Sequence, residues 1–280
     1  MRSKNKTNKN EDVLIYSDNN NGVGIIQFNR PSKLNALRNK TLDFLEKYIT
    51  EMNENDSVKV IIIKGSGGSF CSGVDIDELA GGVSKGPHKW SKDESVDELR
   101  RRFSQSHRII SMIYRSEKPY IAAIEGVAVG AGLDIACACD IRVSSEDAKF
   151  RSAYIKIGLF PGYGGIWLYQ RLIGYGKASE LVFTGRWMYA KEALNSGLLN
   201  YTFSKDDFQK KIMELATDIS QSAPIALRLS KILMRDANTI DLEPSLRMAS
   251  IAESITLSSE DHEEAMQALR QGRDPIFKGI

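Results

Sequence analysis

The chain begins with two short apolar runs separated by a polar turn. Val13–Tyr16 and Val23–Phe28 are rich in branched residues, and the letters between them, SDNNNG, have the composition of a hairpin turn. Apolar residues then recur at helical spacing over Leu37–Met52, and a strongly β-branched run spans Val58–Lys64. A further buried strand is indicated at Tyr120–Ile124. This alternation favours an α/β fold, with helices packed on a largely parallel sheet.

Three glycines crowd the segment that follows the last of these strands. Gly126, Gly130 and Gly132 are separated by small residues, and the pattern becomes helical from Ala131 onward. The glycines therefore lie where a strand leads into a helix N-terminus, whose free N–H groups and dipole favour negative charge. Such a site can hold a phosphate or a developing oxyanion, although close helix packing would explain the same glycines. Neither the dinucleotide-binding fingerprint nor a P-loop is present.

The remaining pattern divides the chain into three parts. Residues 1–12 are polar and predict a mobile tail, residues 13–204 form the core, and residues 205–280 form an α-helical region. Within the core, residues 75–97 read as a long loop and Val96–Tyr114 as a helix. The helices predicted for the C-terminal region are Phe208–Gln221, Ile225–Asp236, Leu242–Ser254 and Glu260–Gln271.

Composition excludes several classes of protein. The 280 residues include 38 basic and 36 acidic ones, and this balance argues against a nucleic-acid surface. No apolar run is long enough for a membrane span, and the polar N-terminus is no secretory signal, although an organellar presequence is an alternative to a mobile tail. Cys71, Cys137 and Cys139 form no disulfide framework, which indicates a reducing compartment, the cytoplasm. With three histidines, none near a cysteine in sequence, no metal site is expected.

Four segments together resemble the crotonase superfamily, the enoyl-CoA hydratase/isomerase family. They read NRPSKLNAL, GSFCSGVDIDEL, IAAIEGVAVGAGLDIACACDIR and KIGLFPGYGGIWLYQRLIG, and the resemblance spans roughly Val13–Lys278. It implies a crotonase (ClpP/crotonase-like) fold with a ββα-type superhelical core and a C-terminal α-helical extension that builds a homotrimer or homohexamer. It also implies an acyl-CoA thioester as substrate, with no cofactor besides the coenzyme A that the substrate carries.

The resemblance also assigns the reacting groups. The backbone N–H groups of Val74 and Ala131 match the pair that polarises the thioester carbonyl in the family. Asp134 stands where the hydratases carry one of two catalytic glutamates and some dienoyl-CoA isomerases an aspartate; an acidic residue in a first helical turn is also favoured by the dipole alone. Tyr154 replaces the second glutamate, and it is either a catalytic group or a wall of the acyl pocket. Gly162 stands where other relatives place an aspartate.

Contacts with coenzyme A are expected from two lysines. Lys33 matches a CoA-contacting position, though an ordinary surface lysine would look the same, and Lys278 could meet a phosphate, from this subunit or a neighbouring one. Tyr169 is expected in the core and His107 matches no motif. The other positions that match the substrate-binding motifs are Ala36, Ser72, Gly73, Asp75, Ile76 and Gly130.

With one carboxylate shortened and the other absent, the residues favour double-bond isomerisation, or another reaction that needs one carboxylate, over hydration by two glutamates. The chemistry is acid–base catalysis at C2–C4 of an acyl-CoA, with the enolate held by Val74 and Ala131. A decarboxylase or thioester hydrolase on the same scaffold, and a non-catalytic acyl-CoA-binding paralogue, are the alternatives.

Overall fold

The computed structural model describes residues 11–18, 21–79 and 96–280. Residues 1–10 of the predicted N-terminal tail and residues 80–95 of the predicted 75–97 loop lie outside these residues. Asp12, predicted to be part of the mobile tail, is buried and accepts a hydrogen bond from Arg38 at 2.6 Å, so the ordered core begins before Val13. The strands are β1 Val13–Asp18, β2 Val23–Phe28, β3 Val60–Gly65, β4 Tyr120–Ile124, β5 Val127–Val129, β6 Ile141–Ser145, β7 Lys149–Arg151, β8 Met188–Tyr189 and β9 Tyr201–Phe203. The helices are η1 Pro31–Lys33, α1 Asn39–Glu54, α2 Ile76–Leu79, α3 Val96–Arg115, α4 Ala131–Ala138, η3 Ala153–Ile157, α5 Gly165–Thr184, α6 Ala190–Asn195, α7 Lys205–Ser220, α8 Pro224–Asp236, α9 Leu242–Leu257 and α10 Glu260–Gln271.

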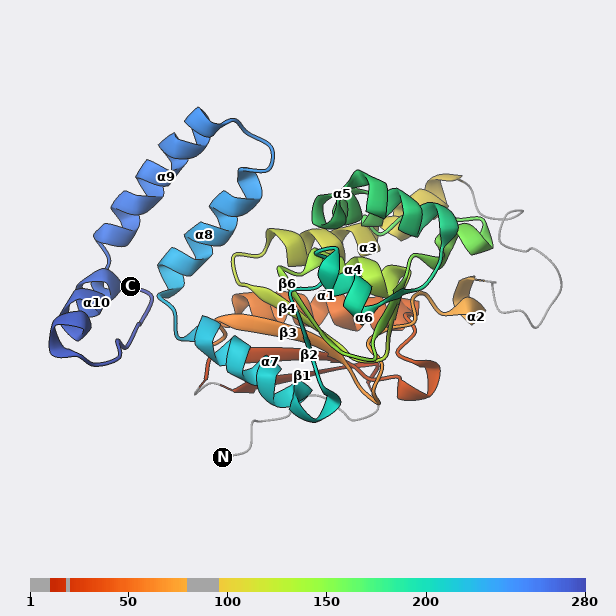
Figure 1. Ribbon diagram of the computed structural model, residues 1–280, viewed down its shortest axis with the longest axis horizontal. Coiled ribbons are helices and arrows are strands. Elements are labelled where there is room, and N and C mark those ends of the chain that lie inside the picture. Colours follow the sequence, from red (N-terminus) through yellow and green to blue (C-terminus); the bar gives the residue numbers. More distant parts are fainter. Residues whose placement is uncertain (1–10, 19–20, 80–95) are drawn as a thin grey trace.

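A six-stranded sheet forms the centre of the core. Its order is β1-β2-β3-β4-β6-β9; β1 and β2 form the predicted antiparallel hairpin, and every later pairing is parallel. Apolar residues on both faces of β3 and β4 are buried, as expected for central parallel strands covered on two sides. Helices α1, α3, α4 and α5 lie on one face (Figure 1). The α/β fold predicted from the hydrophobic pattern is confirmed.

A small second sheet joins the loop after β3 to the segment that leads into α4. Its order is β5-β7-β8, and β5 directly follows β4. The isolated bridge between Cys71 and Ala128 joins this sheet to the loop after β3. The loop after β3 and the N-terminus of α4 are thereby placed side by side.

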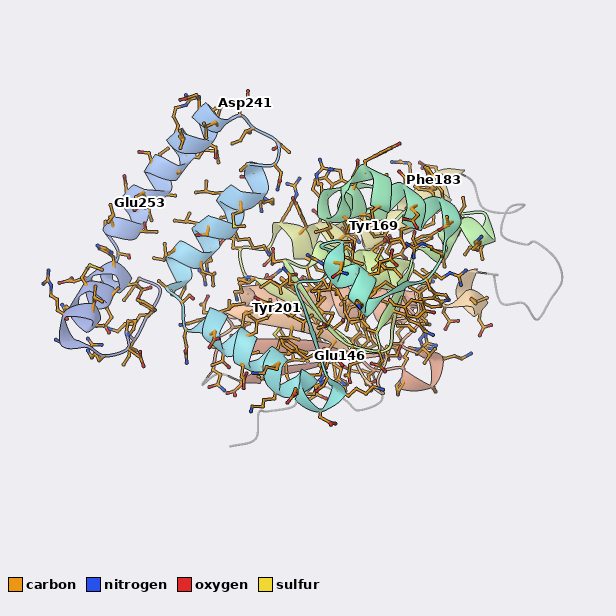
Figure 2. The ribbon with its side chains drawn as sticks, in the orientation of Figure 1. Glu146, Tyr169, Phe183, Tyr201, Asp241 and Glu253 are labelled. Atoms are coloured by element: carbon orange, nitrogen blue, oxygen red, sulfur yellow. The ribbon has the colours of Figure 1, made fainter. Side chains whose placement is uncertain are left out.

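Helix α7 covers the other face of the large sheet, and the chain beyond it leaves the core. Phe208, Ile212 and Ala216 of α7 are buried against the sheet. Helices α8, α9 and α10 form an arm that projects from the core (Figure 1), and Asp241 and Glu253 lie on it well away from the sheet (Figure 2). The part of the predicted 205–280 region that extends beyond the core therefore begins at α8.

An ion pair between a buried lysine and a partly exposed aspartate fixes the start of this arm. Lys231 of α8 donates to the Asp140 carboxylate at 2.7 Å and to the carbonyl of Lys118 at 2.8 Å. The same carboxylate accepts the backbone N–H of Tyr120 at 2.7 Å, so it also closes the turn before β6. None of the helices in the described ranges is long and apolar enough to cross a membrane.

Candidate functional site

The loop after β3 turns one backbone amide toward a cavity. Leu37 donates its N–H to the carbonyl of Gly73 at 2.8 Å and accepts the N–H of Asp75 at 2.7 Å. In this parallel bridge the amide of the residue between them, Val74, faces away from Leu37. Gly73 has a φ of 95°, a conformation that favours glycine, and it makes this turn possible.

The first residue of α4 presents a second amide beside the first. Ala131 follows Gly130, whose φ is 51°, and its N–H is one of the four that a helix cannot satisfy internally. A Cβ placed on Gly73 would lie 3.8 Å from the nitrogen of Ala131. Val74 and Ala131 both line the same cavity, so their amides can donate to one oxygen there.

Gly132 allows the two segments to approach this closely. A Cβ at this position would lie 2.5 Å from the carbonyl oxygen and 2.7 Å from the Cβ of Cys71. Nothing larger than hydrogen therefore fits between α4 and the loop after β3. The glycine serves helix packing and amide placement together, so the two interpretations of these glycines are compatible.

The cavity has a volume of about 560 Å³ and a mostly apolar lining. Arg100, His107, Tyr154 and Tyr163 bring titratable side chains to it, and no aspartate or glutamate lines it among the residues with described side chains. The apolar lining suits an acyl chain. The lining residues are Ser72, Gly73, Val74, Ile76, Arg100, Phe103, Ser104, His107, Val129, Gly130, Ala131, Ala153, Tyr154, Ile157, Leu159, Phe160, Gly162 and Tyr163.

Asp134 lies directly behind this lining, inside a cluster of hydrogen-bond donors. The Tyr154 hydroxyl donates to its Oδ2 at 2.7 Å, and the Tyr169 hydroxyl donates to its Oδ1. The backbone amides of Tyr163 and Gly165 also hydrogen-bond to the carboxylate. Gly165 is the first residue of α5, so the N-terminus of that helix faces the carboxylate.

Burial dominates the protonation of this carboxylate. Asp134 is 0% exposed, and burial raises its pKa to about 7 although the bonds from Tyr154 and Tyr169 act in the opposite direction. Burial and the adjacent Asp134 also raise the pKa of both phenols well above their ordinary value. Near neutral pH the cluster therefore holds one group, Asp134, that exchanges a proton readily.

Two of the predicted contact residues are engaged in holding the turn. Arg30 donates to the Asp75 carboxylate at 2.8 Å and to the carbonyl of Ala36 at 2.6 Å. Burial alone would raise the pKa of Asp75, but the bond from Arg30 holds it below the usual range. Neither Ala36 nor Asp75 lines the cavity. Their observed contacts are structural.

The other predicted contacts fall in different places. Ser72 and Ile76 line the cavity with Gly73 and Gly130. Lys33 lies on the surface beside Asp77, with 3.4 Å between its Nζ and the carboxylate. The exposed Lys278 donates its backbone N–H to Asp261 of α10 and lies with the arm, on the opposite side of the molecule from α2 (Figure 1). A single chain therefore does not bring Lys278 to the cavity.

Three residues of this site were not assigned to it from the sequence. Tyr169, expected in the core, is 0% exposed and lies in the layer of helices above the sheet (Figure 2), but its hydroxyl binds Asp134. His107 lines the cavity, with its Nε2 2.8 Å from the carbonyl oxygen of Gly162. Tyr163 contributes both a cavity wall and an amide to Asp134. The position of His107 could have been predicted from the sequence, because it lies seven residues after Arg100 and therefore on the same face of α3. Arg100 also lines the cavity.

Two adjacent amides at an apolar cavity, with a carboxylate behind its wall, form an arrangement that can stabilise an oxyanion on an acyl group. The chain matches the family model described as enoyl-CoA hydratase/isomerase over residues 18–279. It therefore belongs to the enoyl-CoA hydratase/isomerase family, whose enzymes act on acyl-CoA thioesters, and the crotonase fold is confirmed.

Individual relatives differ in the reactions that their names state. The chain is 33% identical over 252 residues to the short-chain-enoyl-CoA hydratase of Clostridium acetobutylicum, covering 90% of this chain and 92% of that protein. It is 32% identical to the peroxisomal Delta(3,5)-Delta(2,4)-dienoyl-CoA isomerase of Arabidopsis thaliana, covering 94% and 95%. The crystal structure of an enoyl-CoA hydratase from Bacillus anthracis matches with a TM-score of 0.87 at 30% identity, covering 96% and 100%.

Proposed function

We propose that the protein moves the double bond of an enoyl-CoA by means of one carboxylate, Asp134. The observation that carries this proposal is the carboxylate of Asp134, which meets the cavity wall. Among the residues with described side chains no aspartate or glutamate lines the cavity itself, and Gly162 lines it without a side chain. One carboxylate can take a proton from one carbon and return it to another. Stereospecific water addition normally requires one group to orient the water and another to donate a proton.

The two amides supply the other half of the chemistry. When a proton leaves C2 of the substrate, negative charge moves onto the thioester oxygen. The amides of Val74 and Ala131 are already directed into the cavity, so they stabilise this charge without reorganisation. Return of the proton at C4 completes the shift of the double bond, and this sequence requires no cofactor beyond the coenzyme A of the substrate.

The surfaces proposed to hold coenzyme A follow from the same placement. Ser72, Gly73 and Ile76 line one side of the cavity. The Ser72 hydroxyl donates to the carbonyl of Lys33 at 3.2 Å, so the exposed Lys33 lies beside this side of the cavity. We assign Lys33 to a CoA phosphate in this subunit and Lys278 to one across a subunit boundary, because Lys278 lies with the arm. The proposed location is the cytoplasm, which the three free, buried cysteines support.

Wild-type enzyme should convert a 3-enoyl-CoA into the conjugated 2-enoyl-CoA faster than it hydrates crotonyl-CoA. The absorbance of the conjugated enoyl thioester reports both reactions, because isomerisation increases it and hydration decreases it. Exchange of the C2 protons with D₂O, followed by mass spectrometry, tests enolate formation separately. Faster hydration than isomerisation would contradict the proposal and indicate a hydratase. Tight binding of CoA esters without turnover or exchange would indicate a binding protein.

We also propose that the arm joins three or six copies of the chain. Apolar side chains on its helices are exposed, including Ile251 at 66% and Leu269 at 75%, and an exposed apolar surface of this kind marks an interface. Light scattering at micromolar concentration should give a trimer or hexamer. A double variant, Ile251→Lys in α9 and Leu269→Lys in α10, should shift it toward monomer, whereas Glu253→Lys in α9 should not. A wild-type monomer would contradict this prediction.

A further inference from the structure

The residues of the Asp134 cluster are arranged in depth from the cavity inward. Tyr154 lines the cavity and is 8% exposed, Asp134 lies behind it at 0%, and Tyr169 lies on the opposite side of the carboxylate, also at 0%. Among the residues whose side chains the structure describes, Asp134 and Tyr169 are absent from the cavity lining. A substrate in the cavity therefore meets the phenol of Tyr154 before the carboxylate.

We infer that the proton leaves and returns through the Tyr154 hydroxyl, with Asp134 as the buried acceptor behind it and Tyr169 as the positioning residue. This inference rests on the proposed isomerase function and specifies the path of its proton. It assigns Tyr154 as the catalytic residue that touches substrate. It also gives Asp134 a role that does not require direct contact with the reacting carbon.

Each half of the reaction then transfers two protons together along one line. In the first half the C2–H bond breaks, its proton joins the Tyr154 oxygen, and the hydroxyl proton of Tyr154 moves 2.7 Å across to Oδ2 of Asp134. The electron pair of the broken bond moves to the thioester oxygen, between the amides of Val74 and Ala131. In the second half the same transfers run backward to C4, so Tyr154 and Asp134 end as they began.

The position of the phenol fits this path. A Cβ placed on Gly130 would lie 3.6 Å from Cζ of Tyr154, so the ring packs against the backbone that immediately precedes Ala131. The hydroxyl-bearing end of the ring is thus next to the amide pair. C2 is bonded to the thioester carbonyl carbon, so a carbonyl oxygen held by these amides brings C2 close to the same ring.

Electrostatics require the two transfers to be concerted. Burial and the neighbouring Asp134 raise the pKa of Tyr154 well above its ordinary value, so a free tyrosinate does not accumulate. Burial raises the pKa of Asp134 to about 7, which makes it an effective acceptor at neutral pH. Tyr154 therefore relays the proton, and Asp134 holds it until it is returned to C4.

Tyr169 determines which oxygen of the carboxylate faces Tyr154. Its hydroxyl binds Oδ1, and this leaves Oδ2 for the Tyr154 hydroxyl. The bond from Tyr169 also stabilises the ionised form of Asp134 and so lowers its pKa. Removing this bond should turn the carboxylate away from Tyr154 and raise the pH at which Asp134 ionises.

The titratable groups that face the Asp134 carboxylate all have a pKa far above 7, so among them only Asp134 changes charge near neutral pH. They are Tyr154 from η3, Tyr169 from α5 and Cys137 from α4, with Cys71 facing Tyr154 from the loop after β3. Burial raises the pKa of Cys71 and Cys137 to about 12 and that of the two phenols well above 10.

The central test replaces each phenol by Phe. Tyr154→Phe should lower kcat for isomerisation about 10²-fold, the scale of a positioned acid–base group. Adding Asp134→Asn to it should cause little further loss, because residues that act as a unit are not additive. Tyr169→Phe should lower kcat about 10-fold, leave KM unchanged and move the pH profile to higher pH. Tyr120→Phe is the matched control: it removes a buried hydroxyl that donates to Asn53 at 2.9 Å, away from the cavity, and should keep wild-type kcat.

A measurement on the wild-type enzyme keeps the inference testable if Tyr154→Phe does not fold. A 3-enoyl-CoA deuterated at C2 should react more slowly in H₂O than the unlabelled substrate, and more slowly still in D₂O. The second effect arises because the Tyr154 hydroxyl proton, which exchanges with solvent, moves as the C2 bond breaks.

The outcomes separate this inference from the function on which it rests. If wild-type enzyme isomerises the substrate but a folded Tyr154→Phe retains its rate within about threefold, the relay is wrong and the isomerase proposal stands. No solvent effect on the deuterated substrate would overturn the relay in the same way. If wild-type enzyme neither isomerises enoyl-CoA substrates nor exchanges C2 protons, the proposed function itself fails.

Discussion

Asp134→Asn should reduce kcat for isomerisation by at least about 10²-fold and abolish its dependence on pH between 5 and 8. In wild-type enzyme the carboxylate must be ionised to accept a proton, and burial raises its pKa to about 7. The rate should therefore fall about tenfold for each pH unit below that value and level off above it. The asparagine variant lacks this carboxylate, so its residual rate should not show this dependence. The measurement is kcat/KM for a 3-enoyl-CoA across this pH range.

The control for this prediction is another aspartate in a first helical turn. Asp206 occupies that position in α7, is exposed and lies outside the cavity lining. Asp206→Asn should leave rate and pH profile unchanged, so a loss confined to Asp134→Asn separates catalysis from a favourable helix dipole. Near wild-type activity in Asp134→Asn would refute the one-carboxylate mechanism.

Gly132→Ala should lower kcat by about 10²–10³-fold by displacing one of the two amides, the scale of losing an oxyanion donor. The new Cβ would lie 2.5 Å from the carbonyl oxygen of Cys71, so α4 or the loop after β3 must move. Either movement separates the amide of Ala131 from that of Val74. Overpacking should also destabilise the fold by about 1–3 kcal/mol. Steady-state kinetics and thermal unfolding of the same variant measure the two effects.

Gly176→Ala provides the comparison for a glycine without such a neighbour. Gly176 lies inside α5, and a Cβ there would meet no atom within 4 Å. This variant should keep its activity and unfold at an equal or higher temperature, because alanine is the better helix former. A Gly132→Ala enzyme with wild-type kcat would show that the amide pair tolerates displacement, which contradicts the prediction.

Much of the fold was predictable because local periodicity and burial agree. Val23–Phe28 and Glu260–Gln271 have the bounds that the hydrophobic pattern predicts. Helix α1 begins at Asn39 rather than at Leu37, because the N–H and carbonyl of Leu37 pair with the loop after β3. The three-residue strand β7 was not predicted, since so short a strand depends on partners distant in sequence. The docking of α7 on the sheet was missed for a similar reason: a helical pattern does not reveal which surface the apolar face covers.

The sequence predicted many of the positions that form the candidate site, but not which of them line the cavity and which lie behind its wall. The motif places Asp134 three residues after Ala131, and in the structure it lies in the first turn of α4. Tyr154 and Tyr169 reach the carboxylate from 20 and 35 residues further along the chain, so only the tertiary structure shows that one shields it and the other holds it. The same reasoning applies to His107, which meets Gly162 across the cavity wall.

The contact between Asp134 and Gly165 means that the residue types at these two positions constrain each other. A Cβ on Gly165 would lie 2.3 Å from Oδ1 of Asp134, so the carboxylate already fills the space that a side chain at 165 would need. A glutamate at 134 would extend one methylene further into the same contacts. Replacing Asp134 by glutamate would therefore not simply restore a longer acid. The longer side chain would also require changes at Gly165, Tyr154 and Tyr169, which contact the carboxylate.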